Sequence, residues 1–145
     1  MDKAPAGVRD GAQMQTETEK TSSRVLEMIG LKGQVTKGRA TPLPCSGYDA
    51  EGAVQQNHHP WSLHGVPFAE LEKAYAGLRT AFPESGWKVV SDGPDKSKAK
   101  TPTLVADSPD GEFSAEVRLL NREGQSGSTS LINVTVVSRC YEVAP

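Results

Sequence analysis

The chain has 145 residues, of which 36% are hydrophobic, and carries a formal net charge of -2. This length supports one compact domain with a single core, and the scattered lysines and arginines form no basic patch, which argues against nucleic acid as a partner. No stretch approaches the roughly 20 apolar residues that span a bilayer, and the N-terminus lacks the basic start and apolar centre of a secretory signal. Taken alone, the missing signal points to the cytoplasm.

Residues 1–10 are rich in Ala, Pro, Gly and charge, and we predict them to be a disordered tether before a single α+β domain at 11–145. A first helix is expected to begin after Asp10, a typical N-cap, and to end at Gly30 and Gly33. Its apolar stripe is loose and consists of Met14, Val25, Met28 and Ile29. Because its middle is polar, we expect its first half to project or fray.

The clearest predicted element is a second helix within residues 66–87. Pro67 suits its first turn, and Pro83 and Gly86 stop it. Its apolar side chains recur at spacings of three and four: Phe68, Leu71, Tyr75, Leu78 and Phe82. The charged residues fall mostly on the other side, which is expected to be solvated.

Beyond the second helix the hydrophobic period changes to two, which predicts strands. Residues 53–65 form a further predicted strand, in which Pro60 indicates a sheet edge or a bulge. We therefore predict an α+β two-layer sandwich, an antiparallel sheet of four or five strands with two helices on one face. The second helix is expected to be a crossover that sets the strands on either side of it parallel. The four strands after it lie within 86–93, 101–111, 112–124 and 128–141.

All three histidines lie in the segment QNHHPWSLHG, residues 56–65. In a strand, His59 shares a face with Trp61, whereas His58 and His64 lie on the opposite face. His58 and His64 would then be roughly 20 Å apart, whereas zinc binds histidine nitrogen at about 2 Å. Surface imidazoles around a core tryptophan are therefore expected; a metal site would require the segment to loop back.

No motif of known catalytic chemistry appears. The chain has no G-x-S-x-G, Gly-rich phosphate loop, H-E-x-x-H or paired-carboxylate motif. We therefore predict no catalytic, metal-binding or cofactor-binding residue and no cofactor. If a cleft exists between sheet and helices, Tyr48, His59 and Tyr141 are the residues expected near its mouth.

The two cysteines, Cys45 and Cys140, belong to no CxxC pair and have no histidine at metal-ligand spacing. A disulfide between them is the simplest interpretation, and two buried, unpaired thiols are the alternative. The bond would close a loop of nearly a hundred residues, which stabilises the fold by about 4 to 5 kcal/mol in the chain-entropy model. Such bonds persist outside the cytosol. The expected disulfide is compatible with the missing secretory signal if Met1 replaces a removed leader or lipid-anchor segment.

The order HPWSLHGVPFAELEKAYAGLRTAFPESGWKVVSDG, TPTLVADSPDGEFSAEVRLL and INVTVVSRCY resembles a group of small exported proteins of Streptomyces-type actinobacteria. These proteins are often lipid-anchored and mostly of unassigned function. The resemblance covers about residues 12–143, and its marks are the strand with Trp61, the pair Gly86-Trp87 and the closing Ser138 to Tyr141. It implies export to the outer face of the membrane and brings no catalytic residue. The chain lacks a leader and a lipid-accepting cysteine, so membrane association is expected only through an anchor absent from it.

These observations favour a non-enzymatic exported protein of the cell envelope, a binding or structural module that is extracellular or at the outer face of the cell membrane. Its expected partner is an envelope protein or ligand, not nucleic acid, and its expected contact surface is the uncovered face of the sheet. The alternative is a small-ligand binder or enzyme that uses a cleft between sheet and helices. A cytosolic adaptor or regulator is the third possibility.

Overall fold

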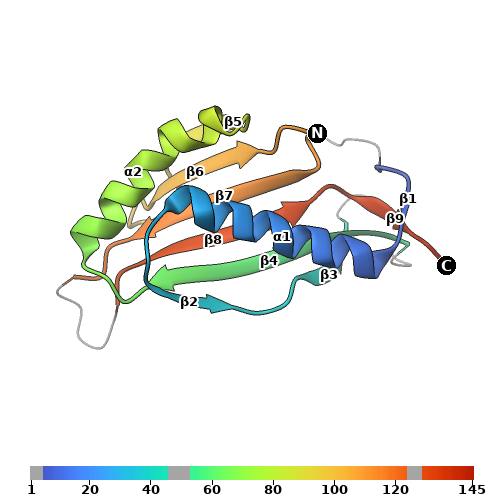
Figure 1. Ribbon diagram of the computed structural model, residues 1–145, viewed down its shortest axis with the longest axis horizontal. Coiled ribbons are helices and arrows are strands. Elements are labelled where there is room, and N and C mark those ends of the chain that lie inside the picture. The colour runs from blue at the N-terminus through green and yellow to red at the C-terminus, as the bar shows by residue number, and fades with distance from the viewer. Residues whose placement is uncertain (1–4, 46–52, 124–128) are drawn as a thin grey trace.

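A computed structural model of the chain describes residues 5–45, 53–123 and 129–145, in which two helices cover the same face of one nine-stranded sheet (Figure 1). The helices are α1 (Gly11–Ile29) and α2 (Phe68–Glu84). The strands are β1 (Val8–Arg9), β2 (Gln34–Lys37), β3 (Thr41–Pro44), β4 (Val54–His64), β5 (Lys88–Pro94), β6 (Pro102–Asp107), β7 (Phe113–Leu120), β8 (Leu131–Ser138) and β9 (Tyr141–Val143).

The sheet runs in the order β1-β9-β4-β8-β7-β6-β5, and β2 and β3 both pair with β4. Among the described strands, only β1 and β9 pair in parallel. Successive antiparallel pairs leave β4 and β5 running in the same direction, with β8, β7 and β6 between them. The predicted α+β class, with a mostly antiparallel sheet and both helices on one face, is confirmed.

The predicted number of four or five strands is wrong. The five strands that the sequence predicts, β4 to β8, are present, but β1, β2, β3 and β9 are added to them. Each added strand has only two to four residues, and β2 and β3 are exposed along their whole length. β2 and β3 therefore have no buried face, and β1 and β9 are too short to show an alternation, so only their pairing partners make these segments strands.

Helix α1 begins and ends where its sequence predicts. The Asp10 side chain accepts a hydrogen bond from the backbone N–H of Ala12, and Gly30 ends the helix at a φ of 67°. The prediction that its first half frays is wrong, because its polar middle is buried: Thr18, Thr21 and Ser22 are at most 1% exposed. Thr18 Oγ1 donates to the carbonyl of Met14, and Thr21 Oγ1 to that of Glu17. Their hydroxyls therefore enter the core already hydrogen-bonded.

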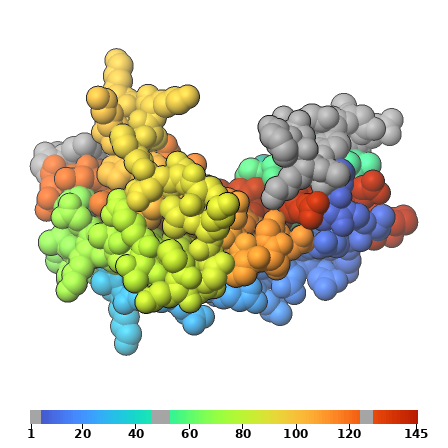
Figure 2. Space-filling model, turned by 90° about the horizontal axis from the view of Figure 1, so that it is seen from above, coloured from blue at the N-terminus to red at the C-terminus, as the bar shows by residue number. Residues whose placement is uncertain are grey.

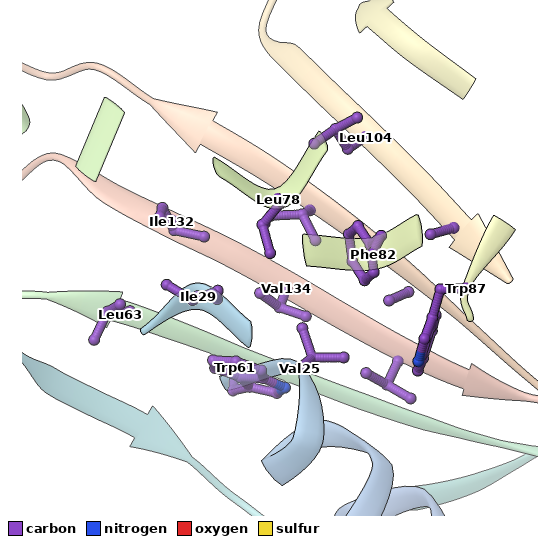
Figure 3. Close-up of a cluster of buried hydrophobic side chains, with 14 of the residues drawn as sticks. Val25, Ile29, Trp61, Leu63, Leu78, Phe82, Trp87, Leu104, Ile132 and Val134 are labelled. Carbon is purple, nitrogen blue, oxygen red and sulfur yellow. The ribbon is translucent and has the colours of Figure 1, made fainter. Parts of the chain in front are cut away.

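The core lies between the helices and the sheet. Figure 3 shows Val25 and Ile29 of α1 and Leu78 and Phe82 of α2 among side chains from the inner face of the sheet. Each such side chain, when fully buried, contributes about 1.5 to 3 kcal/mol. The predicted stripe of α2 is thereby confirmed except at Phe68, which is only partly buried.

The N-terminal segment joins the sheet before the predicted domain boundary at residue 11. The backbone N–H of Ala6 donates to the carbonyl of Cys140, and Val8 pairs with Glu142 in the β1–β9 ladder. Ala6 also packs against the core. The chain therefore follows the sheet edge from Ala6 onward, where the sequence predicts a tether up to residue 10; residues 1–4 lie outside the described residues.

The predicted disulfide between Cys45 and Cys140 is confirmed. The two Cα atoms are 6.1 Å apart, and the residues are separated by 95 positions in sequence. Gln55 of β4 pairs with Pro44 on one side and with Tyr141 on the other. Because each cysteine adjoins one of these two partners, the disulfide joins the chain segments on both sides of β4.

Replacing both cysteines, Cys45→Ala with Cys140→Ala, should lower the free energy of unfolding by about 4 kcal/mol, because the long loop in the unfolded chain is released. Urea unfolding followed by tryptophan fluorescence measures the change. Reduced wild-type protein is the control, since it loses the bond and keeps both sulfurs. A loss below about 1 kcal/mol would show that the β4 ladders hold the fold without the bond.

Candidate functional site

A cleft of about 660 Å³ lies where the C-terminal parts of α1 and α2 approach the turn between β6 and β7. Trp87 and Phe113 are only 6% and 9% exposed, so they form the floor of this α1–α2 cleft. The volume falls within the range of small-molecule sites, roughly 300 to 1,000 Å³. Its full lining is Thr21, Arg24, Glu27, Met28, Ala81, Glu84, Ser85, Trp87, Ser108, Pro109, Asp110 and Phe113.

Trp87 is positioned by the way α2 ends. The backbone N–H of Gly86 donates to the carbonyl of Pro83 at 3.0 Å, and that of Trp87 to the carbonyl of Phe82 at 2.9 Å. These are the two bonds of a Schellman motif, which needs the positive φ of 82° that Gly86 adopts. The apolar contact typical of the motif is present, because the rings of Phe82 and Trp87 lie 5.4 Å apart. Local backbone bonding therefore fixes the indole in the floor.

The tight turn at residues 108–111, between β6 and β7, forms one wall. The backbone N–H of Gly111 donates to the carbonyl of Ser108, whose own N–H donates to the carbonyl of Phe113. Asp110 Oδ1 accepts from the Ser108 hydroxyl at 2.7 Å and from the N–H of Glu112 at 2.9 Å. The hydrogen bond from Ser108 is the main reason why the pKa of Asp110 is lowered. This carboxylate therefore stays charged at the rim of the cleft.

The rim has an excess of negative charge, with the carboxylates of Glu27, Glu84 and Asp110 against the single guanidinium of Arg24. Arg24 interacts electrostatically with Asp110 and helps to lower its pKa. Within the described part of the chain, Glu27 and Glu84 form no ion pair. Two carboxylates, one from each helix, therefore remain available to a ligand.

His59 does not reach this cleft. Its side chain is fully buried, with Nδ1 2.6 Å from Ser22 Oγ and Nε2 2.7 Å from the carbonyl oxygen of Gly38. Because a carbonyl only accepts, Nε2 carries a proton that it donates to Gly38, and Nδ1 is hydrogen-bonded to the Ser22 hydroxyl. The predicted sharing of a face with Trp61 is confirmed, but the expectation of a surface imidazole at this position is wrong.

The burial of His59 follows from a gap in the sheet edge. β2 ends opposite Trp61 and β3 begins opposite His58, so residues 38–40 pair with none of the described strands. Their backbone groups bond to side chains instead. Besides the bond from His59, Gln15 Nε2 donates to the carbonyl of Ala40 at 2.6 Å, and Glu19 Oε2 accepts from its N–H at 2.8 Å. The polar middle of α1 thus satisfies backbone groups that the sheet leaves open.

The other predicted site residues lie apart from the cleft. Tyr141 is fully buried and its hydroxyl accepts from Asn57 Nδ2 at 2.7 Å, while Tyr48 lies outside the described residues. His58 and His64 are half-buried on the opposite face of β4, as predicted, and burial lowers the pKa of His58. The expectation that His59 or Tyr141 lines a cleft mouth is therefore wrong.

The uncovered face of the sheet is largely polar. One row across it holds Ser62, Asn133 and Arg118. The loop after β5 projects from this side (Figure 2). Large exposed apolar side chains in the described part of the chain stand singly on four separate strands: Val8, Val35, Leu43 and Val90. No continuous apolar patch for a protein partner is formed by these residues.

Comparison of the chain with protein-family models, with curated proteins and with solved structures gave no match. Within the described residues, no group of three or more His, Cys, Asp or Glu side chains is placed to hold a metal ion, and neither helix is long and apolar enough to cross a membrane. The geometry of the chain itself therefore carries the functional argument. It points to the α1–α2 cleft, whose floor is aromatic and whose rim is anionic.

Most lining residues of the cleft were missed by the sequence reasoning. The turn at 108–111 and the pair Gly86-Trp87 were recognised, but as structure and not as parts of one site. Arg24 and Glu27 stand on a helix whose contact with the β6–β7 turn no local pattern reveals. The helix-ending glycine followed directly by tryptophan is the signal that identifies the floor, since a Schellman motif holds that position against the helix.

Ser22→Ala should lower the free energy of unfolding by about 1 to 3 kcal/mol, because it removes the hydrogen-bond partner of the buried Nδ1 of His59. Its neighbour Ser23 is exposed, and Ser23→Ala should change stability by no more than about 0.5 kcal/mol. Chemical denaturation of both variants measures the difference. Equal effects would contradict the proposed role of Ser22.

Gly86→Ala should destabilise the protein by about 1 to 2 kcal/mol, because a side chain disfavours the positive φ and its Cβ would lie 3.3 Å from Pro109 Cγ. Gly77, inside α2, has no atom within 4 Å of an added Cβ. Gly77→Ala should therefore stabilise the protein by about 0.5 to 1 kcal/mol. Thermal unfolding and near-ultraviolet circular dichroism of both variants test whether the two substitutions change the stability in opposite directions. An unchanged stability in Gly86→Ala would contradict the proposal that the Schellman motif fixes Trp87 in the floor.

Proposed function

We propose that the chain is an exported, non-enzymatic binding protein of the cell envelope. The disulfide between Cys45 and Cys140 carries this proposal, because such bonds persist in oxidising compartments and are rare in the cytosol. The resemblance to small exported, often lipid-anchored proteins of Streptomyces-type actinobacteria supports the same location. In this proposal the chain acts outside the cytoplasm, free or held at the outer face of the membrane.

A structural role for His59 supports the non-enzymatic part of the proposal. Ser22 and His59 have the separation of a nucleophile and its general base, but both side chains are fully buried. A base must come within hydrogen-bond reach of the proton that it takes from a substrate. The second nitrogen of His59 is held by Gly38, so the imidazole has no free position. We assign this pair to the stability of the fold.

The α1–α2 cleft supports binding of a small ligand, the alternative that the sequence left open. Polar groups from both helices and from the β6–β7 turn converge above an aromatic floor, which is the usual composition of a ligand site. The uncovered sheet face is mainly polar, with its apolar side chains scattered. We therefore place the contact surface in the cleft instead of on that face.

The state of the cysteines in protein isolated from its own cells tests the export. Protein extracted without reductant and unfolded in the presence of a maleimide should take no label, and reduction should expose both thiols. The single variant Cys45→Ala is the control, because its remaining Cys140 should react on unfolding. Labelling of the unreduced wild-type protein would contradict export and favour a cytosolic adaptor.

A further inference from the structure

The floor and the rim of the α1–α2 cleft together indicate which chemical class of ligand it takes. We propose that the cleft binds a small organic cation, an amine carried on a flat apolar body. This inference rests on the proposed binding function and names its ligand class.

The floor accounts for the apolar body of the ligand. Trp87 and Phe113 close the bottom of the cleft, and Met28 and Pro109 add apolar surface beside them. Aromatic side chains favour stacked or edge-to-face contact with a flat ring, and their faces attract a nearby cation. Because the end of α2 and the β6–β7 turn hold these rings by backbone hydrogen bonds, the surface is formed before a ligand arrives.

The rim accounts for the positive charge of the ligand. Arg24 and Asp110 offset each other, which leaves Glu27 on α1 and Glu84 on α2 as the carboxylates of this cleft that no described residue compensates. Both side chains are exposed, so a ligand in the cleft can reach their carboxylates from solvent. Their combined field attracts a cation and repels an anion of the same shape.

Three probes of similar shape and different charge test the ligand class. Isothermal titration calorimetry at neutral pH and low salt should show binding of phenethylamine, weaker binding of 2-phenylethanol and none of 3-phenylpropionate. Added salt should weaken the binding of the amine and leave the binding of the alcohol unchanged. In proton–nitrogen NMR spectra, the indole N–H signal of Trp87 should shift with the amine, while that of Trp61, which does not line the cleft, should stay.

Two double variants with the same change in charge test the site. Glu27→Gln with Glu84→Gln should weaken the binding of phenethylamine about tenfold, which is the combined effect of losing two partly exposed ion pairs. Glu72→Gln with Glu142→Gln removes two exposed carboxylates outside the cleft, and its affinity should stay within about twofold of wild type. All four positions are exposed, so both variants should keep the wild-type circular dichroism spectrum.

Equal binding of the amine and the alcohol, or equal loss in the two double variants, would overturn the proposed ligand class. A lysine-rich peptide that binds far more tightly than the amine and shifts signals of the uncovered sheet face would also overturn it. The labelling of the cysteines is independent of these titrations. Unreactive cysteines with no amine binding would refute the ligand class alone, whereas reactive cysteines would refute export whatever the cleft binds.

Discussion

The disulfide that crosses β4 constrains the rest of the architecture. β4 pairs with β2 and β3 on one side and with β8 and β9 on the other, and Cys45 and Cys140 join those sides. Once β8 is fixed beside β4, antiparallel pairing places β7, β6 and β5 in order. Helix α2 must then cross three strands to connect β4 with β5. That crossing brings the end of α2 near α1 and the β6–β7 turn, which is where the cleft forms.

The same central strand explains why polar groups lie inside the core. The gap between β2 and β3 exposes backbone groups of residues 38–40 to the underside of α1, and burial without partners would cost about 1 to 3 kcal/mol for each group. Gln15, Glu19 and His59 supply those partners, and Ser22 completes the bonding of His59. Each of these hydrogen bonds joins two different segments of the chain, so the cluster specifies one register of α1 against the sheet.

The sequence could predict the features that carry a local signal, and it could not predict those that depend on residues distant in the chain. Both helices, β4 to β8 and the tight turn carry their own period, cap or turn residues, and the two cysteines had one simple pairing. The short strands of the sheet edges have no such signal. Pro60 illustrates the limit, since it indicated an edge or a bulge yet lies in a central strand, opposite residues that have no strand partner there. The burial of His59 likewise depended on Gly38, whose position no spacing reveals.

The floor and the rim of the cleft differ in how they depend on the fold. Trp87 and Phe113 belong to the hydrophobic core and are held by a helix cap and a tight turn, so changing them disturbs packing. Glu27 and Glu84 are exposed and contribute little to folding, because solvent screens surface charges. The fold therefore sets the size and the aromatic character of the site, while the charge at its rim is free to vary. A related chain with lysine at these two positions would keep this architecture and prefer an anionic ligand of the same shape.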